Sequence, residues 1–239
     1  MSTDNAIEIQ QLQFSWPGAA RPLLNIPQLH LASGSSLFIA GPSGCGKSTL
    51  LNLVAGVQSG YQGSIQVCGQ SLAALRPRQR DQLRADRIGV IFQQFNLLPW
   101  LSPRENVVLG CRFSPQRQQR VQARSGSLEA EATRLLAELG LERVADSRQT
   151  TASLSIGQQQ RVAAARALIG SPPLIIADEP TSALDANHRD RFIDLLLEEC
   201  RANGSALLFV SHDAALAQHF DGSLHLGDPD HPATGAASC

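Results

Sequence analysis

A glycine-rich loop between an apolar strand and a helix restricts the fold of this chain more than any other feature. Residues 41–49, Gly-Pro-Ser-Gly-Cys-Gly-Lys-Ser-Thr, fit the pattern G-x-x-x-x-G-K-[ST] of loops that surround nucleotide phosphates. The apolar residues 37–40 precede the loop as a buried strand would, and apolar residues at helical spacing follow it in 50–54. This strand–loop–helix order is the context that the motif requires, so the sequence predicts a site for a nucleoside triphosphate.

The residue types of the loop suit a phosphate chain. Gly41, Gly44 and Gly46 accept backbone angles closed to other residues, which lets main-chain N–H groups turn inward. Lys47 adds a full charge toward the β- and γ-phosphates, and Ser48 offers a hydroxyl to Mg²⁺. The predicted phosphate-binding residues are Gly41, Ser43, Gly44, Cys45, Gly46, Lys47, Ser48 and Thr49.

A second apolar strand ends in two carboxylates, in residues 174–179 (Leu-Ile-Ile-Ala-Asp-Glu). Beside a phosphate loop, Asp178 could hold Mg²⁺ and Glu179 could accept a proton from the attacking water. The alternative is a strand that merely ends in two solvated acids. The phosphate loop earlier in the chain favours the catalytic interpretation.

The segment between these two strands resembles a family signature. Residues 154–162, Leu-Ser-Ile-Gly-Gln-Gln-Gln-Arg-Val, are similar to the signature peptide of ATP-binding-cassette (ABC) ATPases, usually Leu-Ser-Gly-Gly-Gln. In the family a helix follows this peptide, which here predicts a helix at about residues 161–169. Gln93 matches the glutamine of the family's Q-loop, residues 182–185 match its D-loop, and His212 matches its switch histidine. With six motifs in the family's order between about residues 7 and 226, the chain is identified as a member of the ABC ATPases.

The resemblance implies a fold. It is a P-loop NTPase fold of the ABC type, α/β, with a parallel-sheet core, an N-terminal antiparallel β region and an inserted helical subdomain at about residues 96–160. One domain would cover residues 1–226. Residues 227–239 hold little to bury and are expected to form a flexible tail.

The resemblance also implies roles within a dimer, because the signature of one ABC subunit serves the nucleotide of its partner. The expected cofactors are ATP and Mg²⁺. Trp16 stands where the family stacks an aromatic ring on adenine, and a tryptophan buried in the core is the alternative. The catalytic residues would be Gln93, Glu179 and His212, the Mg²⁺ residues Ser48, Gln93 and Asp178, and the residues acting in trans Ser155, Gly157, Gln158 and Asp185.

A membrane permease is the partner that the family implies. The apolar run of residues 95–101 beside Gln93 would form part of the docking patch if several of its side chains are exposed, and the alternative places them in the interior. Residues 92–99 and 105–107 resemble the ATPases of lipoprotein-releasing and macrolide-exporting systems (LolD/MacB-like), whose permeases are of the FtsX type. Export or extraction with a possible periplasmic adaptor, or regulatory signalling without transport, are the two functions that this subgroup implies.

Composition excludes several classes. Twenty basic and 21 acidic residues leave a net charge of −1, so bulk charge offers no case for a nucleic acid partner. No window approaches the ~18 uninterrupted apolar residues that span a bilayer, and residues 1–5 lack the features of a secretory signal. Five scattered cysteines suggest a reducing compartment without a disulfide or metal framework. We expect a cytoplasmic protein, peripheral on the inner face of the cell membrane.

Two local patterns predict helices, and a third segment is less regular. Ser102, Pro103 and Glu105 form a helix start with a capping box. An apolar stripe over residues 128–139 predicts a helix that Gly140 ends. Residues 112–126 are polar and rich in arginine, which favours a solvated loop or frayed helix over an anion site.

Ile156 is the one departure from the family signature, which has glycine there. Its N–H group remains available to a phosphate, but a β-branched side chain adds bulk at the expected dimer interface. If the side chain points away from the phosphate, the site works nearly normally, and we favour this interpretation. If it points between the subunits, closure is weakened and hydrolysis is slow.

Overall fold

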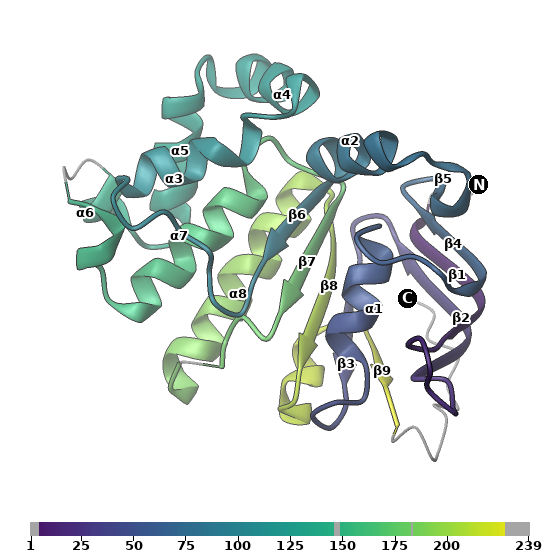
Figure 1. The fold of residues 1–239 in the computed structure, drawn as a ribbon. Helices are drawn as coiled ribbons and strands as arrows, with labels where there is room; N and C mark the ends of the chain where they lie inside the picture. The colour runs from purple at the N-terminus through teal and green to yellow at the C-terminus, as the bar shows by residue number, and fades with distance from the viewer. Residues whose placement is uncertain (1–4, 146–148, 183, 228–239) are drawn as a thin grey trace.

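Two sheets lie side by side in the computed structural model, which describes residues 5–145, 149–182 and 184–227 (Figure 1). The first is antiparallel, with the order β2-β1-β4-β5, and consists of β1 (Asn5–Phe14), β2 (Leu24–Ala32), β4 (Gln62–Val67) and β5 (Gln70–Ser71). The second is parallel, with the order β6-β7-β8-β3-β9, and consists of β3 (Ser36–Ala40), β6 (Ile88–Ile91), β7 (Leu174–Asp178), β8 (Ala206–Ser211) and β9 (Gly222–His225).

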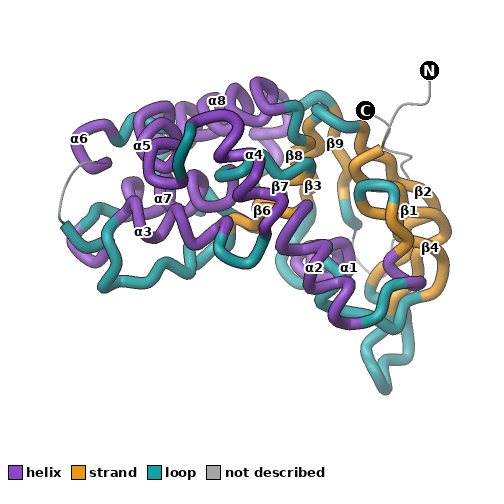
Figure 2. The backbone as a smooth tube through the Cα atoms, turned by 90° about the horizontal axis from the view of Figure 1, so that it is seen from above, coloured by secondary structure: helices purple, strands orange, loops and turns teal. Residues whose placement is uncertain are grey.

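Most of the helices lie at one end of the molecule (Figure 1). Helices α3 to α7 gather at the end beyond β6, whereas the antiparallel sheet lies at the other end, next to α1 (Figures 1 and 2). The α-helices are α1 (Lys47–Val54), α2 (Pro77–Arg87), α3 (Pro103–Val108), α4 (Pro115–Ser125), α5 (Leu128–Glu138), α6 (Glu142–Ala145), α7 (Ile156–Leu168) and α8 (Ala186–Asn203). Short 3₁₀ turns are η1 (Leu72–Ala74), η2 (Leu109–Cys111), η3 (Thr151–Ser153) and η4 (Ala214–His219).

The parallel sheet separates two hydrophobic cores. Its strands β3, β7 and β8 are mostly apolar and buried on both faces, as strands covered on both sides must be. Phe38, Ile175 and Phe209 face the core shared with α5, α7 and α8, and their neighbours along each strand face the core shared with α1 and the antiparallel sheet. The α/β architecture expected from the motifs is confirmed.

The predicted helix starts and stops appear with two differences. The capping box of α3 forms, with Glu105 N–H donating to Ser102 Oγ at 3.3 Å, and the stripe of α5 is buried. The signature helix α7 begins at Ile156, whereas its predicted start was near Arg161. Strand β2 was not predicted because Pro27 interrupts its pattern, although Leu24, Ile26, Leu29 and Leu31 alternate inward.

The expectation for residues 112–126 is wrong. Residues 115–125 form helix α4, and Arg117 is only 3% exposed. The cause is tertiary, because backbone carbonyls at the end of α7 accept hydrogen bonds from this guanidinium, so this one polar side chain of α4 lies in the interior.

The domain limits expected above remain a proposal. We propose that α3 to α6 and the first turn of α7 form the helical subdomain of about residues 96–160, within one domain over residues 1–226. The expected tail falls almost entirely on residues 228–239, outside the described part. Within the described part, no helix combines the length and apolar character that crossing a bilayer requires.

Candidate active site

Three neighbouring strands bring the glycine-rich loop, the two carboxylates and His212 to one edge of the parallel sheet. β3 and β7 flank β8, in parallel registers that pair Ala40 with Ser211 and Asp178 with Val210. The glycine-rich loop follows β3, Asp178 and Glu179 lie at the end of β7, and His212 follows β8. These segments border a pocket of 620 Å³ lined by Trp16, Leu23, Ser43, Gly44, Gly46, Lys47, Ser48, Thr49, Gln93, Glu179 and His212.

The loop has the backbone that its glycines allow. Gly44 and Gly46 have φ angles of 83° and 101°, in the region that side chains disfavour. A Cβ atom on Gly46 would lie 2.7 Å from Leu24 Cδ2, and one on Gly41 would lie 2.6 Å from Cys45 Sγ. The loop therefore packs too closely for side chains at these two positions, with the Cys45 side chain buried beneath it.

Lys47 lies across the mouth of the loop. Its Nζ donates to the carbonyl oxygens of Gly41 and Pro42 at 2.8 and 3.0 Å and lies 3.9 Å from Glu179 Oε1. The residue is 8% exposed. The ammonium is thus held where the loop and the second carboxylate meet.

Side-chain oxygen atoms that could coordinate a metal ion lie near Lys47. Ser48 Oγ donates to Asp178 Oδ1 at 3.3 Å, and Gln93 lines the same pocket. Burial raises the pKa of the Asp178 carboxyl. A cation in this position would offset the desolvation of that carboxylate, and hydroxyl, amide and carboxylate oxygens are ligands that Mg²⁺ accepts.

Glu179 is held by backbone and side chain together. Its φ angle is 46°, uncommon for a residue with a side chain, while its N–H donates to Val210 O at 3.0 Å. His212 Nδ1 lies 2.7 Å from Glu179 Oε2, and the Glu179 side chain is 12% exposed. The carboxylate therefore has one orientation at the edge of the pocket.

The far wall of the pocket is aromatic and apolar. Trp16 is 46% exposed and packs edge-on against Phe14, so the alternative of a core tryptophan does not hold. Leu23 beside it was not predicted as a site residue. Its N–H donates to Phe14 O at 2.8 Å, and this strand pairing, absent from any local pattern, brings it to the pocket.

The signature residues lie outside this pocket. Ser155 caps α7 and accepts from Gln158 N–H, while the Gln158 side chain accepts from Ser155 N–H at 2.9 Å. Ile156 is 55% exposed. Asp185 caps α8 in the same manner, through His188 N–H at 3.1 Å. The prediction for the D-loop includes Ala183, which lies outside the described residues.

A phosphate loop and two carboxylates at the edge of a parallel sheet place the protein among nucleoside triphosphate hydrolases. Residues 24–182 match the family model described as "ABC transporter". The chain is 37% identical over 228 residues to the "Uncharacterized ABC transporter ATP-binding protein YbbA" of Escherichia coli (strain K12), covering 95% of this chain and 96% of that protein. This chain belongs to the ABC transporter family and is one of its ATP-binding ATPases.

Two further similarities extend the comparison. The chain is 42% identical over 206 residues to the "Aliphatic sulfonates import ATP-binding protein SsuB 2" of Burkholderia lata, covering 86% of this chain and 65% of that protein. The dimeric post-hydrolysis state of the ATP-binding cassette MJ0796, bound to ADP and Pi, matches the fold with a TM-score of 0.75 at 30% identity. That match covers 92% of this chain and 93% of the other.

Proposed function

We propose that this ATPase works as a dimer closed around two ATP molecules and drives a membrane permease. The observation that most directly supports a dimer is that Lys47 and Glu179 line the nucleotide pocket, whereas the exposed Ser155, just before α7, does not. A second copy would bring its Ser155, Gly157, Gln158 and Asp185 to the phosphates. MJ0796, a relative of this fold, is described as a dimer with ADP and Pi.

Within one copy, the residues divide the work of hydrolysis. The triphosphate competes with the carbonyls of Gly41 and Pro42 for the Lys47 ammonium, and the Trp16 ring would stack on adenine. Mg²⁺, held by Ser48, Gln93 and Asp178, would neutralise charge on the phosphates. Glu179 accepts a proton from the attacking water, and His212 keeps its carboxylate in place.

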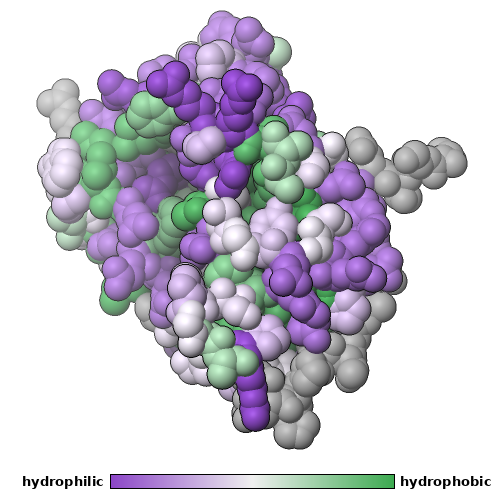
Figure 3. Space-filling view, turned by 45° about the vertical axis from the view of Figure 1, so that its right-hand side comes forward, coloured by the Kyte–Doolittle hydropathy of each residue, from purple (hydrophilic) through white to green (hydrophobic). Residues whose placement is uncertain are grey.

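A groove between the parallel sheet and the helical end is proposed as the permease site. It measures 820 Å³, lies beside α2, β6 and η2, and includes Phe92, Asn96 and Phe113. Phe92 is 42% and Phe113 is 77% exposed, whereas Leu97 of the predicted docking run packs against the core. Hydrophobic surface borders a hollow in the space-filling view (Figure 3). The docking surface proposed here therefore uses Phe92 and Phe113 in place of Leu97.

We further propose an FtsX-type permease and export or extraction of a lipid, lipoprotein, peptide or drug, with the ATPase on the inner face of the membrane. The motifs of residues 92–99 and 105–107 support this subgroup. Import is the second candidate, because a relative 42% identical to this chain is named an import protein. Purification of the tagged protein with its permease distinguishes them: a four-helix permease with a large periplasmic domain supports export, and another type of permease contradicts it.

The dimer is tested with Glu179→Gln. Without the base, ATP should bind and remain intact, so light scattering should detect a stable dimer with ATP and a monomer without it. Adding Gly157→Asp should abolish the dimer and leave ATP binding unchanged, since this position has room for a side chain and lies outside the pocket. A Glu179→Gln variant that hydrolyses ATP at the wild-type rate, or binds ATP and stays monomeric, contradicts the proposal.

A further inference from the structure

A buried arginine of α4 holds the C-terminal end of the signature helix. Arg117 Nε donates to Ile169 O at 2.9 Å, and its Nη2 donates to Ala167 O at 2.8 Å and to Ile169 O at 2.5 Å. Helix α7 ends at Leu168, so these carbonyls belong to its last turn and its cap. One guanidinium thus binds carbonyls that the helix leaves without partners of its own.

The surroundings of Arg117 favour these hydrogen bonds. In the described part of the chain, the oxygens that accept from its guanidinium are these carbonyls, at the negative end of the α7 dipole. Burial lowers the pKa of Arg117 to about 10, which leaves the group charged at neutral pH. Gly170 has a φ angle of 74°, and a Cβ there would lie 2.7 Å from Arg117 Cβ.

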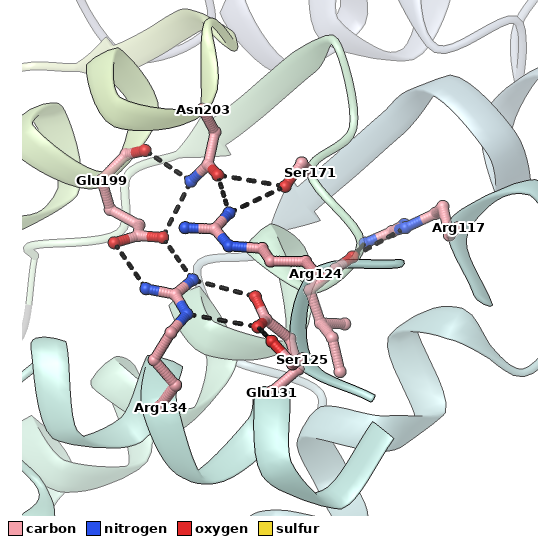
Figure 4. A network of polar contacts seen from close by, with 9 residues as sticks. Arg117, Arg124, Ser125, Glu131, Arg134, Ser171, Glu199 and Asn203 are labelled. Atoms are coloured by element: carbon pink, nitrogen blue, oxygen red, sulfur yellow. Dashed lines mark hydrogen bonds and ion pairs between the residues drawn. The ribbon is translucent and has the colours of Figure 1, made fainter. Parts of the chain in front are cut away.

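Neighbouring arginines hold the same connection between α7 and β7. Arg120 Nε donates to Gly170 O at 2.7 Å and its Nη2 to Asp86 O, in α2, at 3.0 Å. Arg124 bonds Ser171 and Asn203, next to the Arg134–Glu199 pair that joins α5 to α8 (Figure 4). The end of α7 is therefore fixed from several sides, while its first residues at the other end are exposed.

We propose that Arg117 is a positioning residue for ATP hydrolysis: by anchoring the C-terminal end of α7, it aims Ser155 and Gly157 at the nucleotide of the partner subunit. This inference rests on the proposed dimer. Helix α7 has 13 residues, which makes it about 20 Å long. A tilt of about 3° at the anchored end moves the other end by about 1 Å, and a displacement of that size can reduce a rate about 100-fold.

The test uses the ATPase without its permease, because Arg117 also borders the proposed docking groove. In the Glu179→Gln background, Arg117→Met should raise the protein concentration needed for half-maximal ATP-dependent dimerisation at least tenfold. The affinity of the monomer for a fluorescent ATP analogue should stay within twofold, since Lys47 and Trp16 are in the same subunit. Arg112→Met, which removes an exposed arginine preceding the same helix, should change neither quantity.

Arg117→Lys keeps the charge and donors for at least one carbonyl, so its dimerisation should lie between wild type and Arg117→Met. If Arg117→Met does not fold, Arg117→Lys provides the test in its place. With Glu179 intact, Arg117→Lys should lower kcat and leave KM for ATP within twofold. Dimerisation equal to that of the Arg112→Met control overturns the inference, as does a parallel loss of ATP affinity. If Glu179→Gln alone fails to dimerise, the proposed dimer itself is rejected.

Discussion

At the scale of single residues, backbone conformations that side chains disfavour lie close to the proposed chemistry. Glu179, Phe95 and Asn96 all have positive φ angles, between 46° and 56°. Such conformations cost about 1–3 kcal/mol each and persist where the surroundings enforce them. At Glu179 the enforcing contacts are the hydrogen bond to Val210 O and the contact with His212. At Phe95 and Asn96, the Arg166 guanidinium of α7 binds both carbonyls, which links the signature helix to the segment after Gln93.

Trp16 provides a direct test of the adenine site. A Trp100→Phe variant leaves Trp16 as the only tryptophan, and Trp100 is 68% exposed and outside the pocket, so its replacement should not disturb the fold. Stacking on adenine should change the fluorescence of the remaining indole when ATP is added. Fluorescence that stays constant while equilibrium dialysis detects bound ATP would exclude Trp16 from the base site.

Ile156→Gly tests the departure from the family signature. The capping box of α7 joins Ser155 to Gln158 without the Ile156 side chain, which is exposed. We therefore expect the ATPase activity of the permease complex to change by less than about tenfold, equivalent to about 1.4 kcal/mol of barrier. Ser155→Ala, which removes the hydroxyl, is the control and should reduce activity more. A gain well above tenfold for Ile156→Gly would identify the protein as a slow regulatory switch.

At the scale of elements, an ion pair joins α5 to α8. Arg134 contacts Glu131 at 2.9 Å and Glu199 at 2.7 Å, and both glutamates are buried. Arg134→Met leaves two buried carboxylates without their cation, which we expect to cost about 3 kcal/mol. That loss corresponds to a fall in Tm of about 6–12 °C in thermal unfolding. A decrease below 2 °C would show that the pair contributes little.

The same variant has a predicted pH dependence. Burial alone raises the pKa of Glu131, but hydrogen bonds from Arg134 and Ser125 and the charge of Arg134 outweigh it, so the pKa is lowered. A carboxyl with a lowered folded pKa stabilises the fold above its unfolded pKa, about 4.3, and loses that contribution as the pH falls through the folded value. The difference in stability between wild type and Arg134→Met should therefore shrink below about pH 4.

The control for both measurements is Arg201→Met. Its ion pair with Asp221 spans 3.9 Å, and the two side chains are 57% and 46% exposed. Exposed pairs of this kind contribute at most about 1 kcal/mol. We expect a correspondingly small change in Tm near neutral pH, and a fall as large as that of Arg134→Met would argue against burial as the cause.

At the scale of the whole molecule, the groove beside α2 and η2 should bind the permease. Phe113→Asp places a charge at its most exposed aromatic side chain and should reduce co-purified permease at least tenfold, while ATP binding persists. Val57→Asp adds a charge at a residue 62% exposed outside the groove and should have no effect. Equal recovery of permease with both variants would place the docking surface elsewhere.

The sequence predicted those features that depend on local order. The glycine-rich loop, the carboxylates at the end of β7 and the capping box of α3 each depend on residues a few positions apart, so their spacing is visible in the chain. The capping box of α7 has the same spacing, from Ser155 to Gln158, but was not predicted. The α/β class followed from the same motifs. Strand β2 escaped prediction because Pro27 breaks its local pattern, although β1 supplies its hydrogen bonds.

By itself, then, the sequence determined the class of fold and the residue types available for phosphate binding and proton transfer, because both depend on short-range patterns. Only the tertiary structure decided where long polar side chains lie. Arg117 is buried because it binds Ile169, 52 positions further along the chain. Leu23 reaches the nucleotide pocket because it pairs with Phe14, nine positions earlier. No local sequence pattern contains either partner. The sequence alone predicted that the arginines of α4 are solvated. For Arg117 this is wrong, because hydrogen bonds to the carbonyls at the end of α7 compensate for the loss of water around its guanidinium.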